Sequence, residues 1–181
     1  TQFHKQQSTV ALQNGSHVLC EKPLVPIAQE ASELLAVEEN ADGFELGVGF
    51  QWSFSKTMNA LKKDILDGKY GKPVMAKTFI SWPRAHSYYD TSTWKGKILG
   101  DQGQPILDSI LANATAHYAH NIFFILGETQ ETALMPEELD VELYRANDIE
   151  SFDTCFMRGR FANDAEFYYV ASHAVAENHS P

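Results

Sequence analysis

A lysine beside a proline is the first group in the sequence that is placed for chemistry. Lys22 lies in residues 17–24 (HVLCEKPL), where a short apolar run ends in an acid, a base and a proline. Pro23 has no N–H for a sheet ladder and biases Lys22 toward an extended conformation, so we expect a strand to end here. Ligands bind at this carboxyl edge in open α/β sheets. A surface turn with two solvated charges is the alternative.

A histidine on a predicted helix is the second such group. Residues 112–126 (ANATAHYAHNIFFIL) predict a helix that ends at Gly127, with Asn113 and His117 on one face. The Asn113 amide is therefore expected to orient the imidazole by hydrogen bonding. An imidazole held in this way accepts a proton from a substrate hydroxyl, and the ammonium of Lys22 would lower its pKa and favour the neutral base. A satisfied histidine at a domain interface is the alternative.

A metal-dependent isomerase is a weaker interpretation of the same histidines. Carboxylate and imidazole groups form such metal sites, and the spacing of His117 and His120 permits one. The third ligand would be Asp108 or His86. No second motif supports this site, so we predict no metal.

The predicted elements form two architectures in succession. Residues 1–50 read helix, strand, helix, strand, with helices at 3–12 and 27–39 and apolar strands at 17–20 and 44–50. This alternation implies a parallel sheet with helical crossovers, entered in mid-pattern. We therefore expect residues 1–52 to be the C-terminal portion of a parallel α/β domain, and the chain to be an internal fragment.

Residues 53–181 are expected to form an α+β domain that is incomplete at its C-terminus. A helix at 55–66 and a strand at 74–80 precede three strand-like runs at 139–146, 152–161 and 166–175. In the last run Phe167 and Tyr169 share one face by period-2 alternation. The fold class is thus α/β followed by α+β, with a mostly antiparallel or mixed open sheet.

The composition of the chain limits the classes of partner that it is expected to bind. The chain has 181 residues and a formal net charge of −10, which disfavours nucleic acid and anionic membrane surfaces. No run approaches the ~20 consecutive apolar residues of a membrane span. We expect no nucleic-acid or membrane partner and a cytoplasmic location.

Several ordered motifs resemble one enzyme family. They are ALQNGSHVLCEKPL, GVGFQWSF, GKYGKPV, WKGK and NATAHYAHNIFFILG. Together they are similar to the Gfo/Idh/MocA family of glucose-fructose oxidoreductase and inositol dehydrogenase, in which Glu-Lys-Pro ends a Rossmann strand. The resemblance implies that residues 1–52 are the C-terminal portion of a Rossmann dinucleotide-binding domain. It also implies an oxidoreductase that uses NAD or NADP and acts on a sugar, polyol or derivative.

The resemblance also implies roles for single residues. Lys22 would touch the reacting hydroxyl, Glu21 and Pro23 would shape the nicotinamide side of the cleft, and His117 would accept the proton. The Lys22–Pro23 bond is expected to be cis, as is common in relatives. Asn113 stands where the family usually has Asp, so the imidazolium would lack a charged partner and its basicity should be lower.

The long loop at 82–104 supplies the candidate substrate-binding residues. Aromatic faces pack on the apolar faces of sugars, and Arg or Lys binds hydroxyls or a carboxylate. The candidates are Arg84, His86, Tyr88, Tyr89, Trp94 and Lys95. Packing of the loop onto the sheet is the alternative.

Two further expectations concern binding and assembly. The sequence contains no Gly-x-Gly-x-x-Gly, because Trp52 stands where the run GVGF would need its third glycine, so we expect the isolated chain to be inactive and to have negligible affinity for NAD. The rival function is a non-catalytic sugar-binding or assembly module. In either case the sheet face of residues 139–175 is expected to form a homo-oligomer.

Overall fold

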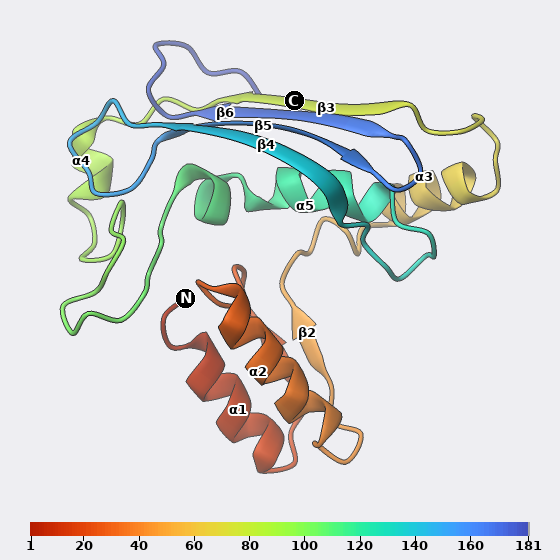
Figure 1. Ribbon diagram of the computed structural model, residues 1–181. Helices are drawn as coiled ribbons and strands as arrows, with labels where there is room; N and C mark the ends of the chain where they lie inside the picture. The colour runs from red at the N-terminus through yellow and green to blue at the C-terminus, as the bar shows by residue number, and fades with distance from the viewer. Residues whose placement is uncertain (181) are drawn as a thin grey trace.

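The computed structural model describes residues 1–180, and its first elements form a small parallel α/β unit (Figure 1). These elements are α1 (His4–Gln13), β1 (Val18–Cys20), α2 (Ala28–Glu39) and β2 (Leu46–Val48). β1 and β2 pair in parallel, with Val18 opposite Leu46 and Cys20 opposite Val48. Because α2 carries the chain back between them, the two strands end at the same edge. The predicted α-β-α-β order is confirmed.

A four-stranded sheet with helices forms the rest of the chain. Its elements are α3 (Lys56–Leu66), β3 (Met75–Ser81), α4 (His86–Tyr89), the π-helical turn η1 (Ile110–Ala114), α5 (Ala116–Ile125), β4 (Pro136–Tyr144), β5 (Thr154–Phe161) and β6 (Glu166–Ser172). The strand order is β3-β6-β5-β4, in which β3 and β6 are parallel and the other pairs antiparallel. The predicted mixed open sheet is confirmed.

The core of this second unit lies between the sheet and α5, which runs beneath it (Figure 1). Phe167, Tyr169 and Ala171 of β6 are fully buried on the helix-facing side, as period-2 alternation predicted. They pack with residues of α5 that include Ala119 and Ile122. The opposite face of the sheet has no helix over it among the described residues (Figure 1).

Two predicted elements differ from the structure. The helix expected over 112–126 is interrupted, because the chain leaves η1 at Ala114 and starts α5 only at Ala116. At the break the Thr115 hydroxyl donates to the Ile110 carbonyl at 2.6 Å and pairs with the Tyr169 hydroxyl. The loop at 82–104 contains the short helix α4. Within residues 1–180, every helix is too short or too polar to cross a membrane.

Candidate active site

Lys22 joins the two units. It follows β1, its peptide bond to Pro23 is cis, and its Nζ donates to the backbone oxygen of Asn113 at 2.6 Å and to the Asn113 side-chain oxygen at 3.3 Å. Burial lowers the pKa of Lys22, while the negative charges of Glu21 and Asp108 oppose that shift. The structure thus brings together Lys22 and Asn113, which are distant in sequence.

Asp108 fixes the other end of Asn113. The Asn113 side-chain N–H donates to one Asp108 oxygen at 3.0 Å, and the Gly96 backbone N–H donates to the other at 2.7 Å. The amide oxygen of Asn113 is therefore turned toward Lys22. Burial raises the pKa of Asp108, and the two hydrogen bonds act against that rise. Sequence reasoning considered Asp108 only as a metal ligand; the available signal was one acid inside the apolar run ILDSI.

His117 lies in the first turn of α5, where its side chain is 9% exposed. The prediction that the Asn113 amide hydrogen-bonds to His117 was wrong. The amide N–H donates to Asp108, and His117 Nδ1 has no hydrogen-bond partner within residues 1–180. A π-helical turn holds more residues than an α-helical one, so a spacing of four across η1 no longer stacks the two side chains. Burial, and next the charge of Lys22, lower the pKa of His117.

Two aromatic rings that sequence reasoning missed surround His117. Trp52 stacks on the imidazole with centroids 4.9 Å apart and planes at 27°. Phe50 meets the same ring nearly at right angles, at 5.8 Å. Both residues follow β2, where only the spacing of glycines had been considered. Aromatic residues beside a strand edge were the signal that was available.

The groups named for a metal site do not converge. The Nδ1 of His120 lies 2.8 Å from the Ser53 hydroxyl, and burial lowers the pKa of His120 to about 4. The exposed His86 instead lies 3.8 Å from Asp90. Among residues 1–180, no three His, Cys, Asp or Glu side chains are grouped to hold a metal ion.

Three of the six candidate loop residues gather at one place. The Lys95 ammonium lies 4.2 Å from the centre of the Tyr88 ring, and the Arg84 guanidinium lies 5.0 Å from it. Tyr88 borders the same small cavity as Asp108 and Asn113, so this cluster adjoins the Lys22 network.

Of the other three loop residues, Tyr89 lies beside Tyr88, with ring centres 5.2 Å apart, and lines the same small cavity, whereas Trp94 and His86 lie farther out. Trp94 is 39% exposed, and its ring lies 5.9 Å from the Lys95 ammonium. His86 turns to Asp90 on the outside of the loop. Tyr89 is buried; its hydroxyl has no partner in the described chain, and burial raises its pKa to about 12.

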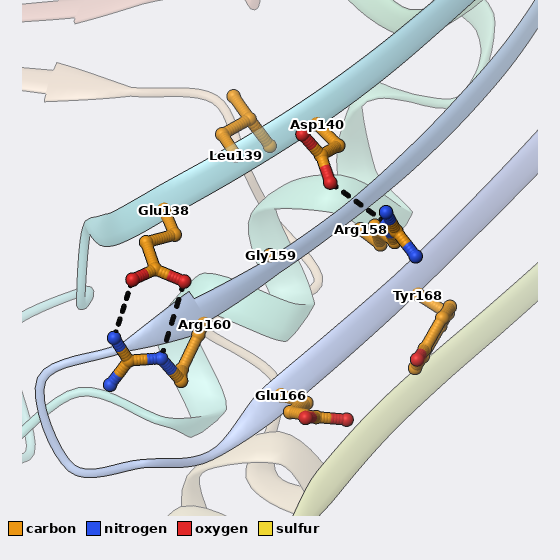
Figure 2. Close-up of a pocket in the computed structure, with 8 residues that line it drawn as sticks. All are labelled: Glu138, Leu139, Asp140, Arg158, Gly159, Arg160, Glu166 and Tyr168. Atoms are coloured by element: carbon orange, nitrogen blue, oxygen red, sulfur yellow. Dashed lines mark hydrogen bonds and ion pairs between the residues drawn. The ribbon is translucent and has the colours of Figure 1, made fainter.

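A separate hollow of about 590 Å³ lies on the open face of the sheet (Figure 2). Glu138 pairs with Arg160 at 2.6 Å, and Asp140 pairs with Arg158 at 2.9 Å. None of the residues that line this hollow belongs to the Lys22 and His117 network. In the two surface ion pairs, each charged side chain is already paired with an opposite charge. We therefore place the candidate active site at the strand edge.

The backbones that follow β1 and β2 approach each other closely at Gly49. Gly49 donates its N–H to the Cys20 carbonyl at 2.7 Å, and a Cβ on Gly49 would lie 3.3 Å from that oxygen and 3.5 Å from the Glu21 Cα. A side chain at residue 49 would press on the backbone after β1, and glycine avoids that contact. Lys22 and Pro23 lie on this same stretch of backbone.

This combination defines a class of protein: a Rossmann-type unit with Lys-cis-Pro at its strand edge, followed by an open mixed sheet whose helix carries a buried histidine. Residues 1–50 match the family described as "Oxidoreductase family, NAD-binding Rossmann fold", Gfo/Idh/MocA. Over these residues the chain is similar to this oxidoreductase family.

Individual relatives carry the names of a reductase and a dehydrogenase, and they are longer than this chain. The chain is 28% identical over 136 residues to a 1,5-anhydro-D-fructose reductase of Ensifer adhaerens, covering 74% of this chain and 37% of that protein. It is 31% identical over 91 residues to an inositol 2-dehydrogenase of Corynebacterium glutamicum strain R, covering 50% of this chain and 27% of that protein. The chain thus spans well under half the length of these relatives.

A solved structure shares the fold. The WlbA dehydrogenase from Bordetella pertussis, in complex with NADH and UDP-GlcNAcA, superposes with a TM-score of 0.81 at 23% identity. The match covers 98% of this chain and 51% of that chain. The similarity therefore extends over both units.

Proposed function

We propose that the chain is the catalytic part of an NAD(P)-dependent oxidoreductase acting on a sugar, polyol or derivative. One observation carries this proposal: Lys22, at the edge of a Rossmann-type sheet, is bonded to Asn113 just before the helix that presents His117. A cation and a neutral base at a strand edge are the groups that dehydrogenation of a carbinol needs. The curated relatives' names support the substrate class.

NAD or NADP, when bound, would accept or supply the hydride. Glu21 and Pro23, at the end of β1, would flank its nicotinamide. Residues 1–180 contain no Gly-x-Gly-x-x-Gly to hold the pyrophosphate, so negligible affinity and inactivity of the isolated chain stay predictions. The WlbA complex with NADH supports the choice of cofactor class.

His117 is the proposed proton acceptor. Its lowered pKa keeps the imidazole neutral at pH 7, so a ring nitrogen is free to take the hydroxyl proton. Nδ1 is buried, which leaves Nε2 to meet the substrate while Nδ1 carries the other proton. Lys22 would stabilise the developing alkoxide, and Asn113 and Asp108 would hold the Lys22 ammonium in place.

The substrate is proposed to lie between Lys22 and the loop cluster. Tyr88 and Trp94 offer ring faces to a sugar, while Arg84 and Lys95 bind its hydroxyls or a carboxylate. Tyr89 would support Tyr88 from the buried side of this cluster, whereas the exposed His86 is paired with Asp90. The substrate named in the WlbA complex, UDP-GlcNAcA, is a sugar derivative and supports the class.

The test compares variants of the full-length protein. Lys22→Met and His117→Ala are each expected to lower turnover of a panel of polyols and aldoses by at least about 100-fold, followed as reduced cofactor. Lys56→Met, at an exposed position, is the matched control and should retain full activity. Unchanged turnover in both site variants would leave the rival non-catalytic sugar-binding or assembly module.

We further propose that the boundary between the two units of the chain lies between residues 52 and 53. We also propose that the chain forms a homo-oligomer through the open face of the four-stranded sheet. Phe79 is 58% exposed on that face, beside Val170 and Phe156 of the neighbouring strands. Burial of these side chains against a second copy would remove apolar area from water. Phe79→Asp is expected to reduce the mass measured by light scattering to that of one chain; a monomeric parent protein would refute the proposal.

A cytoplasmic location is also proposed. Cys20 and Cys155 are both free thiols in the described chain. Reducing compartments keep thiols in that state. Fractionation of cells that produce the full-length protein tests the location, and recovery with extracytoplasmic markers would contradict it.

A further inference from the structure

The imidazole of His117 lacks the polar anchor that normally orients a general base. Its Nδ1 is buried and has no hydrogen-bond partner within residues 1–180. The nearest candidate anchor, Asn113, is bonded to Asp108 and to Lys22 instead. A base must be held in a narrow orientation to be effective, so some other contact has to fix this ring.

Aromatic rings supply that contact. Trp52 covers a face of the imidazole at 4.9 Å and 27°, and Phe50 stands against the same imidazole at 89°. A stacked ring and a perpendicular ring together restrict both the tilt and the spin of the imidazole plane. We propose that Trp52 is a positioning residue that orients the His117 imidazole by stacking, in place of a hydrogen-bonded side chain.

The loop that carries Trp52 is itself held firmly. Phe50 stacks on His120 at 4.0 Å with planes at 4°, and His120 is fixed by Ser53 through its Nδ1. His120 stacks in turn on Phe124, and the buried Lys62 ammonium lies 3.9 Å from the centre of that ring. A column of stacked groups therefore runs from the site into the packing between α3 and α5. The loop cannot shift without breaking these contacts, which is what a positioning element requires.

Exposure separates a positioning role from a purely structural one. Trp52 is 36% exposed and belongs to neither of the two core clusters of the described residues. It also meets Tyr118 at 4.8 Å. Trp82 meets the same Tyr118 at 5.7 Å without touching His117, and therefore provides a matched control. The proposal rests on the proposed function of His117 as the base.

The experiment measures the imidazole directly. In the chain labelled with ¹³C histidine, NMR relaxation reports the order parameter of the His117 ring, and a pH titration reports its pKa. Trp52→Leu is expected to lower the ring order parameter and to raise the pKa of His117 toward its ordinary value, because water reaches the ring. Trp52→Phe, which keeps a ring face, is expected to restore most of the order. Trp82→Leu should change neither value.

Kinetics of the full-length protein complete the test. Trp52→Leu is expected to lower kcat about tenfold while KM changes by less than about twofold, since the substrate pocket is intact. An unchanged order parameter in Trp52→Leu, or an equal loss in Trp82→Leu, would overturn the positioning role. A parent protein that shows the ring effects and lacks turnover would refute the proposed function alone, because the NMR readout does not depend on catalysis.

Discussion

Replacement of Thr115 by valine tests the break that separates η1 from α5. Thr115 is fully buried, donates its hydroxyl to the Ile110 carbonyl at 2.6 Å, and pairs with the hydroxyl of the fully buried Tyr169. Valine has nearly the same shape but no hydroxyl. The substitution therefore removes both hydrogen bonds while it leaves the packing volume unchanged, which isolates the polar contribution.

The magnitude follows from which groups lose a partner. In Thr115→Val the Tyr169 hydroxyl stays buried without a partner, which costs about 1–3 kcal/mol of unfolding free energy. The Ile110 carbonyl still accepts a hydrogen bond from the Thr115 backbone N–H at 2.9 Å, so its loss of the hydroxyl partner adds little to the cost in unfolding free energy. In Tyr169→Phe the Thr115 hydroxyl keeps its bond to Ile110, and the cost is about 1 kcal/mol. The double variant leaves no orphaned hydroxyl and should cost less than the sum.

Urea denaturation followed by circular dichroism measures all four proteins of this cycle. We expect a coupling energy of about 1 kcal/mol between the two sites. Thr115→Val should lower Tm by about 4–8 °C, since about 2 kcal/mol corresponds to that shift in a domain of this size. A Thr115→Val variant less destabilised than Tyr169→Phe, or additive costs, would refute the role assigned to this hydroxyl pair.

Two predictions concern pH. Burial, and next the charge of Lys22, lower the pKa of His117, so the rate of the full-length protein should rise with pH through a value below 6.5. Lys22→Met removes the second cause and should move that limb to higher pH; a limb that stays in place would contradict the coupling. Burial lowers the pKa of His120 from 6.5 to about 4 in the folded chain. Between these two pH values the unfolded chain binds more protons than the folded chain, so the free energy of unfolding decreases as pH falls from about 6.5 to 4. After a discount for solvent screening of the partly exposed ring, the contribution of His120 is about 1–2 kcal/mol, so urea denaturation at pH 7 and pH 5 should show a smaller loss in His120→Asn than in the parent.

The sequence by itself determined the order and type of most elements and the position of Lys22. Helical and period-2 spacing of apolar residues is a local property, so α1, α2, α3 and the alternation of Phe167 and Tyr169 could be recognised without neighbours. Pro23 ends β1 by its own covalent structure. The cis bond at Pro23 came from the family resemblance rather than from spacing.

Only the tertiary structure decided which side chains of the site contact one another. The break at Thr115 depends on a hydroxyl of Tyr169, 54 residues away, and that break turns Asn113 from His117 to Lys22 and Asp108. Trp52 stacks on His117 because the turn after β2 lies against α5 in the fold, and no sequence spacing contains that contact. Local patterns encode which backbone forms, whereas partners of polar and aromatic side chains depend on distances between distant segments, which packing alone sets.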